Sequence, residues 1–110
     1  MLRRAATIAR DTLRTSDEIG RYGGEEFLIV AFGADLENAR LLAERLRLAF
    51  AEDQQLDHPQ FTASFGVAEH QHGKPLTTLL ARADDALYAA KGRGRNRVVR
   101  DIELGVPREA

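Results

Sequence analysis

Cysteine is absent from the 110-residue sequence, and its absence excludes two kinds of site. Disulfide frameworks and metal sites built from thiolates both require cysteine. A chain without cysteine fits a reducing compartment, and we therefore expect a cytoplasmic location.

Long apolar runs and an excess of one charge are also lacking. The longest apolar run, Phe27 to Phe32, is far shorter than the roughly 20 residues that span a bilayer. The arginines near the N-terminus are not followed by the apolar core of a secretory signal. The formal net charge of −1 provides no general attraction to nucleic acid or to an anionic membrane. We therefore expect neither as a partner of this chain, and any membrane anchor of the protein would lie in upstream segments.

The residues that are present indicate a folded domain, since 44% are apolar and 30% are charged. Helical spacing of apolar residues and strand patterns alternate along the chain. The expected helices cover 2–13, 36–50 and 76–90, and the expected strands cover 18–22, 27–32, 61–67 and 98–99. Asp35 is placed to cap the second helix, and Gly92 and Gly94 are placed to end the third.

This order of elements predicts an α/β (α+β) sandwich, with helices on a mostly antiparallel sheet. It matches the later part of the ferredoxin-like βαββαβ pattern, in which residues 27–32 form a central strand covered on both faces. The opening strand of that pattern, which lies in the middle of the sheet, has no counterpart in the chain. Because unpaired strand edges would remain, we expect self-association. Residues 1–100 are assigned to this partial domain and residues 101–110 to a C-terminal tail.

The first two strands are joined at Gly23 and Gly24, which are followed at once by Glu25 and Glu26. Two glycines suit the central positions of a tight hairpin turn. A loop of small residues beside two acids would admit a nucleotide phosphate and supply oxygen ligands to its divalent cation. The alternative interpretation is an ordinary surface hairpin.

Four motifs resemble those of the GGDEF domains, the diguanylate cyclases, and cover roughly residues 1–100. Residues 21–27 read RYGGEEF, which is similar to the family signature in its GGEEF variant. Residues 62–68 read TASFGVA and resemble a T-x-S-x-G strand. Residues 83–91 read ADDALYAAK and resemble an A-D-x-A-L-Y-x-A-K helix, and residues 94–97 read GRNR and resemble a closing G-R-N element. The resemblance implies a nucleotidyl-cyclase-type sandwich.

The resemblance also implies an activity, the condensation of two GTP molecules into cyclic di-GMP by two domains that face each other as a homodimer. It implies that Glu25 and Glu26 are catalytic and bind Mg²⁺ or Mn²⁺. Gly23 and Gly24 would admit the nucleotide, and Lys91 and Arg95 would bind its triphosphate. The alternative for the basic segment 91–100 is a solvated helix end that complements the helix dipole. A nucleic-acid site is disfavoured there, since no aromatic residues are interleaved.

A second site is implied upstream of the glycines, where Arg14 and Asp17 resemble the family's inhibitory R-x-x-D motif for cyclic di-GMP. Arg45 would be a third contact. The alternative is an exposed ion pair of little energetic value. His70 and His72 lie two residues apart without a third candidate ligand nearby, and we expect both to be solvated.

The chain also departs from the family. The sequence lacks two segments of the family. One is the D-x-D-x-F-K segment, which completes the metal site, and the other is the N-x-x-x-G-H-x-x-G-D segment, which recognises guanine. We therefore expect a cyclase domain that depends on a longer protein with an upstream sensory domain, and little cyclase activity from these 110 residues alone. The alternative is a module that binds cyclic di-GMP through Arg14 and Asp17 without catalysis.

Overall fold

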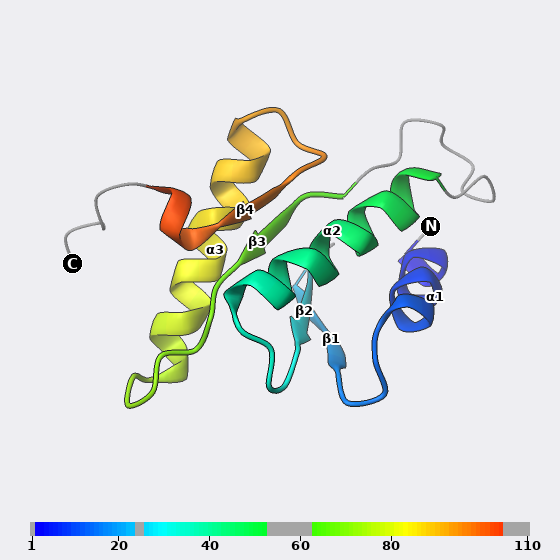
Figure 1. Ribbon diagram of the computed structural model, residues 1–110. Helices are drawn as coiled ribbons and strands as arrows, with labels where there is room; N and C mark the ends of the chain where they lie inside the picture. Colours follow the sequence, from blue (N-terminus) through cyan, green and yellow to red (C-terminus); the bar gives the residue numbers. More distant parts are fainter. Residues whose placement is uncertain (1, 24–25, 53–62, 105–110) are drawn as a thin grey trace.

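The structure is a computed structural model that describes residues 2–23, 26–52 and 63–104. In chain order its elements are α1 (Leu2–Thr12), β1 (Glu18–Gly23), β2 (Glu26–Val30), α2 (Leu36–Glu52), β3 (Phe65–Val67), α3 (Leu76–Gly92), β4 (Val98–Arg100) and the short 3₁₀ helix η1 (Asp101–Leu104). Figure 1 shows α2 crossing the molecule between α1 on one side and α3 on the other. The predicted α+β class is confirmed.

The ends of the helices follow local chemistry that the sequence predicts. Asp35 Oδ1 accepts a hydrogen bond from the N–H of Asn38 at 2.8 Å, which is the N-cap interaction of α2. Helix α3 ends at Gly92, and Gly94 follows with a φ of 119°, a conformation that favours glycine.

Within the described residues the strands form two separate pairs, as the missing middle strand of the pattern would leave them. Strands β1 and β2 pair antiparallel, whereas β3 and β4 pair parallel through the α3 crossover. The prediction that residues 27–32 form a central strand covered on both faces is wrong for the described structure, in which β2 is Glu26–Val30. Within the described residues β2 has β1 as its only neighbour, and Val30 and Phe32 are 40% and 60% exposed.

The hairpin register differs by one residue from the prediction. Gly23 is the last residue of β1 and pairs with Glu26, so it is a strand residue and not a central residue of the turn. The pairing shifts between Arg21 and Gly23, as a bulge would produce. Gly24 and Glu25 themselves lie outside the described residues, as do Phe61 and Thr62 of the predicted third strand.

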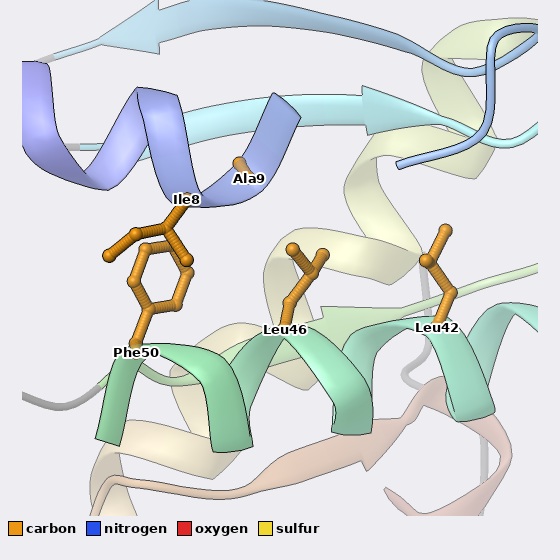
Figure 2. Packing of buried hydrophobic residues seen from close by; sticks show 5 residues of the cluster. All are labelled: Ile8, Ala9, Leu42, Leu46 and Phe50. Carbon is orange, nitrogen blue, oxygen red and sulfur yellow. The ribbon is translucent and has the colours of Figure 1, made fainter. Parts of the chain in front are cut away.

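The main core lies between α1 and α2. Figure 2 shows Ile8 and Ala9 of α1 facing Leu46, Phe50 and Leu42 of α2, and all five side chains are buried. Phe50 also stacks on Phe65 of β3, with ring centroids 6.4 Å apart and an interplanar angle of 26°. The core therefore ties the N-terminal helix to the strand that carries the T-x-S-x-G motif.

A second, smaller core joins α3 to β4, with Ala86, Ala90 and Val99 buried. Leu104 packs against this cluster, so residues 101–104 of the assigned tail form a 3₁₀ turn on the domain. The Arg82 guanidinium of α3 donates to Asp101 Oδ2 at 2.8 Å and fastens the same turn. Within residues 2–23, 26–52 and 63–104, none of the helices has the length and hydrophobicity that crossing a bilayer requires.

Candidate functional site

An ion pair joins the hairpin to the third helix. Lys91 Nζ of α3 lies 3.4 Å from Glu26 Oε2 at the start of β2. The two side chains remain 38% and 41% exposed, so the pair is open to solvent and to a ligand. Two residues that the sequence predicts at the catalytic site are therefore neighbours in the structure, although 65 positions separate them.

The pair lies at the edge of a hollow of about 250 Å³, lined by Glu26, Asp84, Leu87, Tyr88 and Lys91. Positions 84, 88 and 91 share one face of α3, because residues four and three apart are neighbours on a helix. Asp84 and Tyr88 were not among the predicted site residues. Their spacing from Lys91 was the signal that could have identified them.

The hollow contains oxygen ligands of the kind that Mg²⁺ and Mn²⁺ prefer, since the carboxyl groups of Glu26 and Asp84 both line it. In the described part of the chain, no three side chains of metal-binding type gather into a site. Predicted residues Gly24 and Glu25 lie outside that part. The described residues thus offer oxygen donors whose chemistry suits a divalent cation.

Arg95 lies in the loop that follows α3, where its backbone has a φ of 63°. Its N–H donates to the carbonyl oxygen of Ala90 at 2.9 Å and closes the end of the helix. The Arg95 residue is exposed, and within the described residues its guanidinium has neither a hydrogen-bond acceptor nor an ion-pair partner. The structure therefore leaves this predicted phosphate ligand free to bind.

Arg14 and Asp17 form a close pair at the end of α1. Arg14 Nη2 donates to Asp17 Oδ1 at 2.7 Å, and the Arg14 backbone N–H donates to Asp17 Oδ2 at 2.9 Å. The side chain of Asp17 is fully buried, whereas that of Arg14 is 48% exposed. Arg14 Nη2 also donates to the carbonyl oxygen of Phe32 at 3.2 Å, which links the pair to the end of the hairpin.

The hydrogen bond from Arg14 lowers the pKa of the Asp17 carboxyl group below its usual value, although burial acts in the opposite direction. The positive charge of Arg45 contributes in the same direction as Arg14. All three residues predicted at the inhibitory site are thus electrostatically connected, and Asp17 is an anion at neutral pH.

His70 and His72 line a different hollow of about 390 Å³, together with Glu69, Arg82 and Asp101. Both histidines are exposed, and His70 Nε2 lies 3.2 Å from the carbonyl oxygen of Lys74. The Glu69 carboxyl group accepts from the N–H of Leu36 at the start of α2. The polar side chains of Glu69, His70, Arg82 and Asp101 are therefore used within the fold.

Comparison with known proteins agrees with the motifs. Residues 1–97 match the family model described as diguanylate cyclase, GGDEF domain. Diguanylate cyclase DgcM of Escherichia coli K12 is 43% identical over 86 residues, which are 78% of this chain and 21% of that protein. Diguanylate cyclase VdcA of Vibrio cholerae is 44% identical over 85 residues, which are 72% of this chain and 25% of that protein. The chain thus spans about a quarter or less of these two relatives.

Solved structures show the same fold. The structure is similar to the active GGEEF domain of a diguanylate cyclase from Vibrio cholerae, with a TM-score of 0.82, 32% identity and coverage of 99% of this chain and 67% of that one. It is also similar to the GGDEF domain of DgcB from Caulobacter crescentus in complex with c-di-GMP, with a TM-score of 0.80, 28% identity and coverage of 92% and 63%. The chain belongs to the diguanylate cyclase, GGDEF domain family.

Proposed function

We propose that the protein containing this domain condenses two GTP molecules into cyclic di-GMP. The observation that carries the proposal is the Glu26–Lys91 ion pair, which brings the acid of the GGEEF signature and the lysine of the A-D-x-A-L-Y-x-A-K helix to one open hollow. The activity that the relatives' names state supports the same reaction.

The reaction is a double phosphoryl transfer. In each half, the 3′-hydroxyl oxygen of one GTP bonds to the α-phosphorus of the other, the hydroxyl proton is lost, and pyrophosphate leaves. Such transfers depend on positioning and on neutralisation of phosphate charge. Two domains facing each other as a homodimer would align the two nucleotides.

The chain's own residues would hold the triphosphate. Lys91 and Arg95 would donate to phosphate oxygens, and Gly23 and Gly24 would leave room for the nucleotide beside the hairpin. Glu25 and Glu26 would hold Mg²⁺ or Mn²⁺, which neutralises phosphate charge when bound. In the free chain Lys91 is balanced by Glu26, so nucleotide binding would exchange one anionic partner of this lysine for another.

The 110 residues alone would have little cyclase activity. The D-x-D-x-F-K and N-x-x-x-G-H-x-x-G-D segments of the family are not in the sequence, and a partial ligand set places a cation and a nucleotide poorly. An upstream sensory domain would control the longer protein. A protein partner could act in the same way, as in the solved complex of the diguanylate cyclase SiaD with its activator SiaC.

The test is chromatographic measurement of cyclic di-GMP made from GTP by the longer protein with Mg²⁺ or Mn²⁺. We expect Lys91→Ala and Glu26→Gln to lower the rate by about two orders of magnitude, as loss of a charged group that stabilises the transition state does. Lys74→Ala, which removes an exposed lysine of the loop before α3, should leave the rate unchanged. Absence of product from the unaltered protein, or a normal rate in Lys91→Ala, would refute the proposal.

A second candidate function is binding of cyclic di-GMP without catalysis, at Arg14, Asp17 and Arg45. The observation in its favour is the half-exposed Arg14 guanidinium, which the buried Asp17 carboxylate holds in one orientation. A fixed guanidinium fork can bind a phosphate or a guanine edge through two hydrogen bonds.

Calorimetric titration of the chain with cyclic di-GMP tests this candidate. Arg14→Ala should abolish binding, whereas Arg10→Ala, an exposed arginine of the same helix, should leave the affinity unchanged. Equal affinity of Arg14→Ala and the unaltered chain would exclude this site.

A further inference from the structure

The loop after α3 has an unusual backbone for its residues. Arg95 and Asn96 have φ values of 63° and 48°, both in the left-handed region, which asparagine tolerates but arginine rarely adopts. Strain of this kind persists only where surrounding contacts maintain it, and it often accompanies a functional residue.

Asn96 is held by two other elements. Its N–H donates to Ser64 Oγ, just before β3, at 3.1 Å, and its Oδ1 accepts from Arg47 Nη1 of α2 at 2.9 Å. On either side of it, Arg95 N–H donates to Ala90 and the Arg97 carbonyl oxygen accepts from the N–H of Phe65 at 2.9 Å. The Arg95 backbone is thus fixed from both directions while its side chain stays exposed.

Arg47 is itself held in place. Its Nε and Nη2 donate to the two carboxyl oxygens of Glu44 at 2.9 and 2.6 Å, an arrangement that leaves Nη1 for Asn96. The Arg47 side chain is only 19% exposed, so it is more confined than a surface ion pair usually is. A continuous chain of hydrogen bonds runs from Glu44 through Arg47 and Asn96 to Ser64.

We infer that Arg47 and Asn96 are positioning residues, which hold the loop so that the Arg95 guanidinium is presented to the triphosphate of the nucleotide. The inference rests on the proposed function of Arg95 as a phosphate ligand. It gives α2 a part in nucleotide binding, although α2 supplies no residue to the hollow at Glu26 and Lys91. It also means that Ser64 of the T-x-S-x-G motif and Asn96 of the G-R-N motif both hold the loop that carries Arg95.

The test is a titration of the ¹⁵N-labelled chain with Mg²⁺·GTP, followed by amide chemical shifts, which report weak binding. Arg95→Ala should weaken binding about tenfold or more, as loss of a charged hydrogen bond does. Arg47→Ala should weaken it about three- to tenfold, and Arg47→Ala combined with Arg95→Ala should bind no more weakly than Arg95→Ala alone.

The chain offers a matched control. Glu37 and Arg40 form the same kind of pair on α2, with Arg40 Nε and Nη2 donating at 3.0 and 2.6 Å, and no residue of the described loop 93–97 forms a hydrogen bond with them. Arg40→Ala should therefore bind Mg²⁺·GTP like the unaltered chain. Asn96→Asp, which keeps an acceptor for Arg47 and tolerates the left-handed conformation, should also retain binding.

The outcomes separate this inference from the proposed function. If Arg95→Ala weakens Mg²⁺·GTP binding and Arg47→Ala does not, the positioning role alone is overturned. Unchanged affinity in Arg95→Ala would overturn its phosphate role, and the inference with it. In the nucleotide-free chain, amide signals of residues 94–97 should shift in Arg47→Ala and stay in place in Arg40→Ala; signals that stay in place in both variants would overturn the link between α2 and the loop.

Discussion

Gly66 of β3 provides a sharp test of how α3 is held. A Cβ atom at this position would lie 2.8 Å from Leu87 Cα, and closer still to the Ala83 carbonyl oxygen and the Leu87 backbone nitrogen. Non-bonded carbon atoms are normally about 3.5–4.0 Å apart, so α3 would have to move away by on the order of 1 Å. All three opposing atoms belong to the helix backbone, and none can rotate aside as a side chain would.

Gly66→Ala should therefore lower the free energy of unfolding by about 3 kcal/mol or more, at the upper end of what overpacking costs. A domain of this size has roughly 5–15 kcal/mol of stability, and each kcal/mol corresponds to about 4–8 °C in melting temperature. Circular dichroism should thus record a melting temperature at least roughly 10 °C lower. Movement of α3 would also displace Lys91 from Glu26.

Gly20→Ala is the matched control. Gly20 is an exposed glycine of β1, and a Cβ atom built there has no neighbour within 4 Å. Its melting temperature should stay near that of the unaltered chain. A Gly66→Ala variant that melts like Gly20→Ala would show that α3 does not pack on β3 as the structure describes.

Three further predictions concern stability. Leu46 lies in the core of Figure 2 and is 1% exposed, so Leu46→Ala should lower the free energy of unfolding by about 2–5 kcal/mol. Leu48 is 41% exposed on the same helix, and Leu48→Ala should lower it by less than about 1 kcal/mol. Equal urea midpoints of the two variants would contradict this prediction. Asp35→Ala removes the N-cap of α2 and should lower the free energy of unfolding by about 1 kcal/mol in the same urea assay. Asp35→Asn keeps the hydrogen-bond acceptor and should lower it little. Because the pKa of Asp17 is lowered, its pairing with Arg14 stabilises the fold above the unfolded-state pKa of about 3.9, and this stabilisation is lost as pH falls through the lower folded-state pKa. The difference in the free energy of unfolding between the unaltered chain and Asp17→Asn should be constant from about pH 5 to 8 and shrink in acid. A difference of the same size at pH 3 would exclude the mechanism.

The sequence predicts the helices well because each carries its own signals. Apolar spacing marks α1, α2 and α3, and Asp35 and Gly92 mark ends where the structure has them. The family also follows from the sequence, since four motifs occur in order along it. These features depend on neighbours along the chain, which a reader of the sequence can see.

Features that depend on distant partners were missed. The pairing of the hairpin shifts between Arg21 and Gly23, and apolar patterning does not specify such a shift. The bond between Arg47 and Asn96 joins residues 49 positions apart. The spacing of Asp84 from Lys91 places both on one face of α3, but that Asp84 lines the same hollow as Glu26 depends on how α3 packs.

The two separate cores have a consequence for cooperativity. The first core unites α1 and α2, and the second unites α3 and β4. Glu26 belongs to the hairpin, which packs on the first core, whereas Lys91 belongs to α3. A nucleotide held by Lys91 and, through its divalent cation, by Glu26 would therefore cross-link the two units that these cores form. Slower amide hydrogen exchange should then spread through both units on binding, far beyond the residues in contact with the ligand.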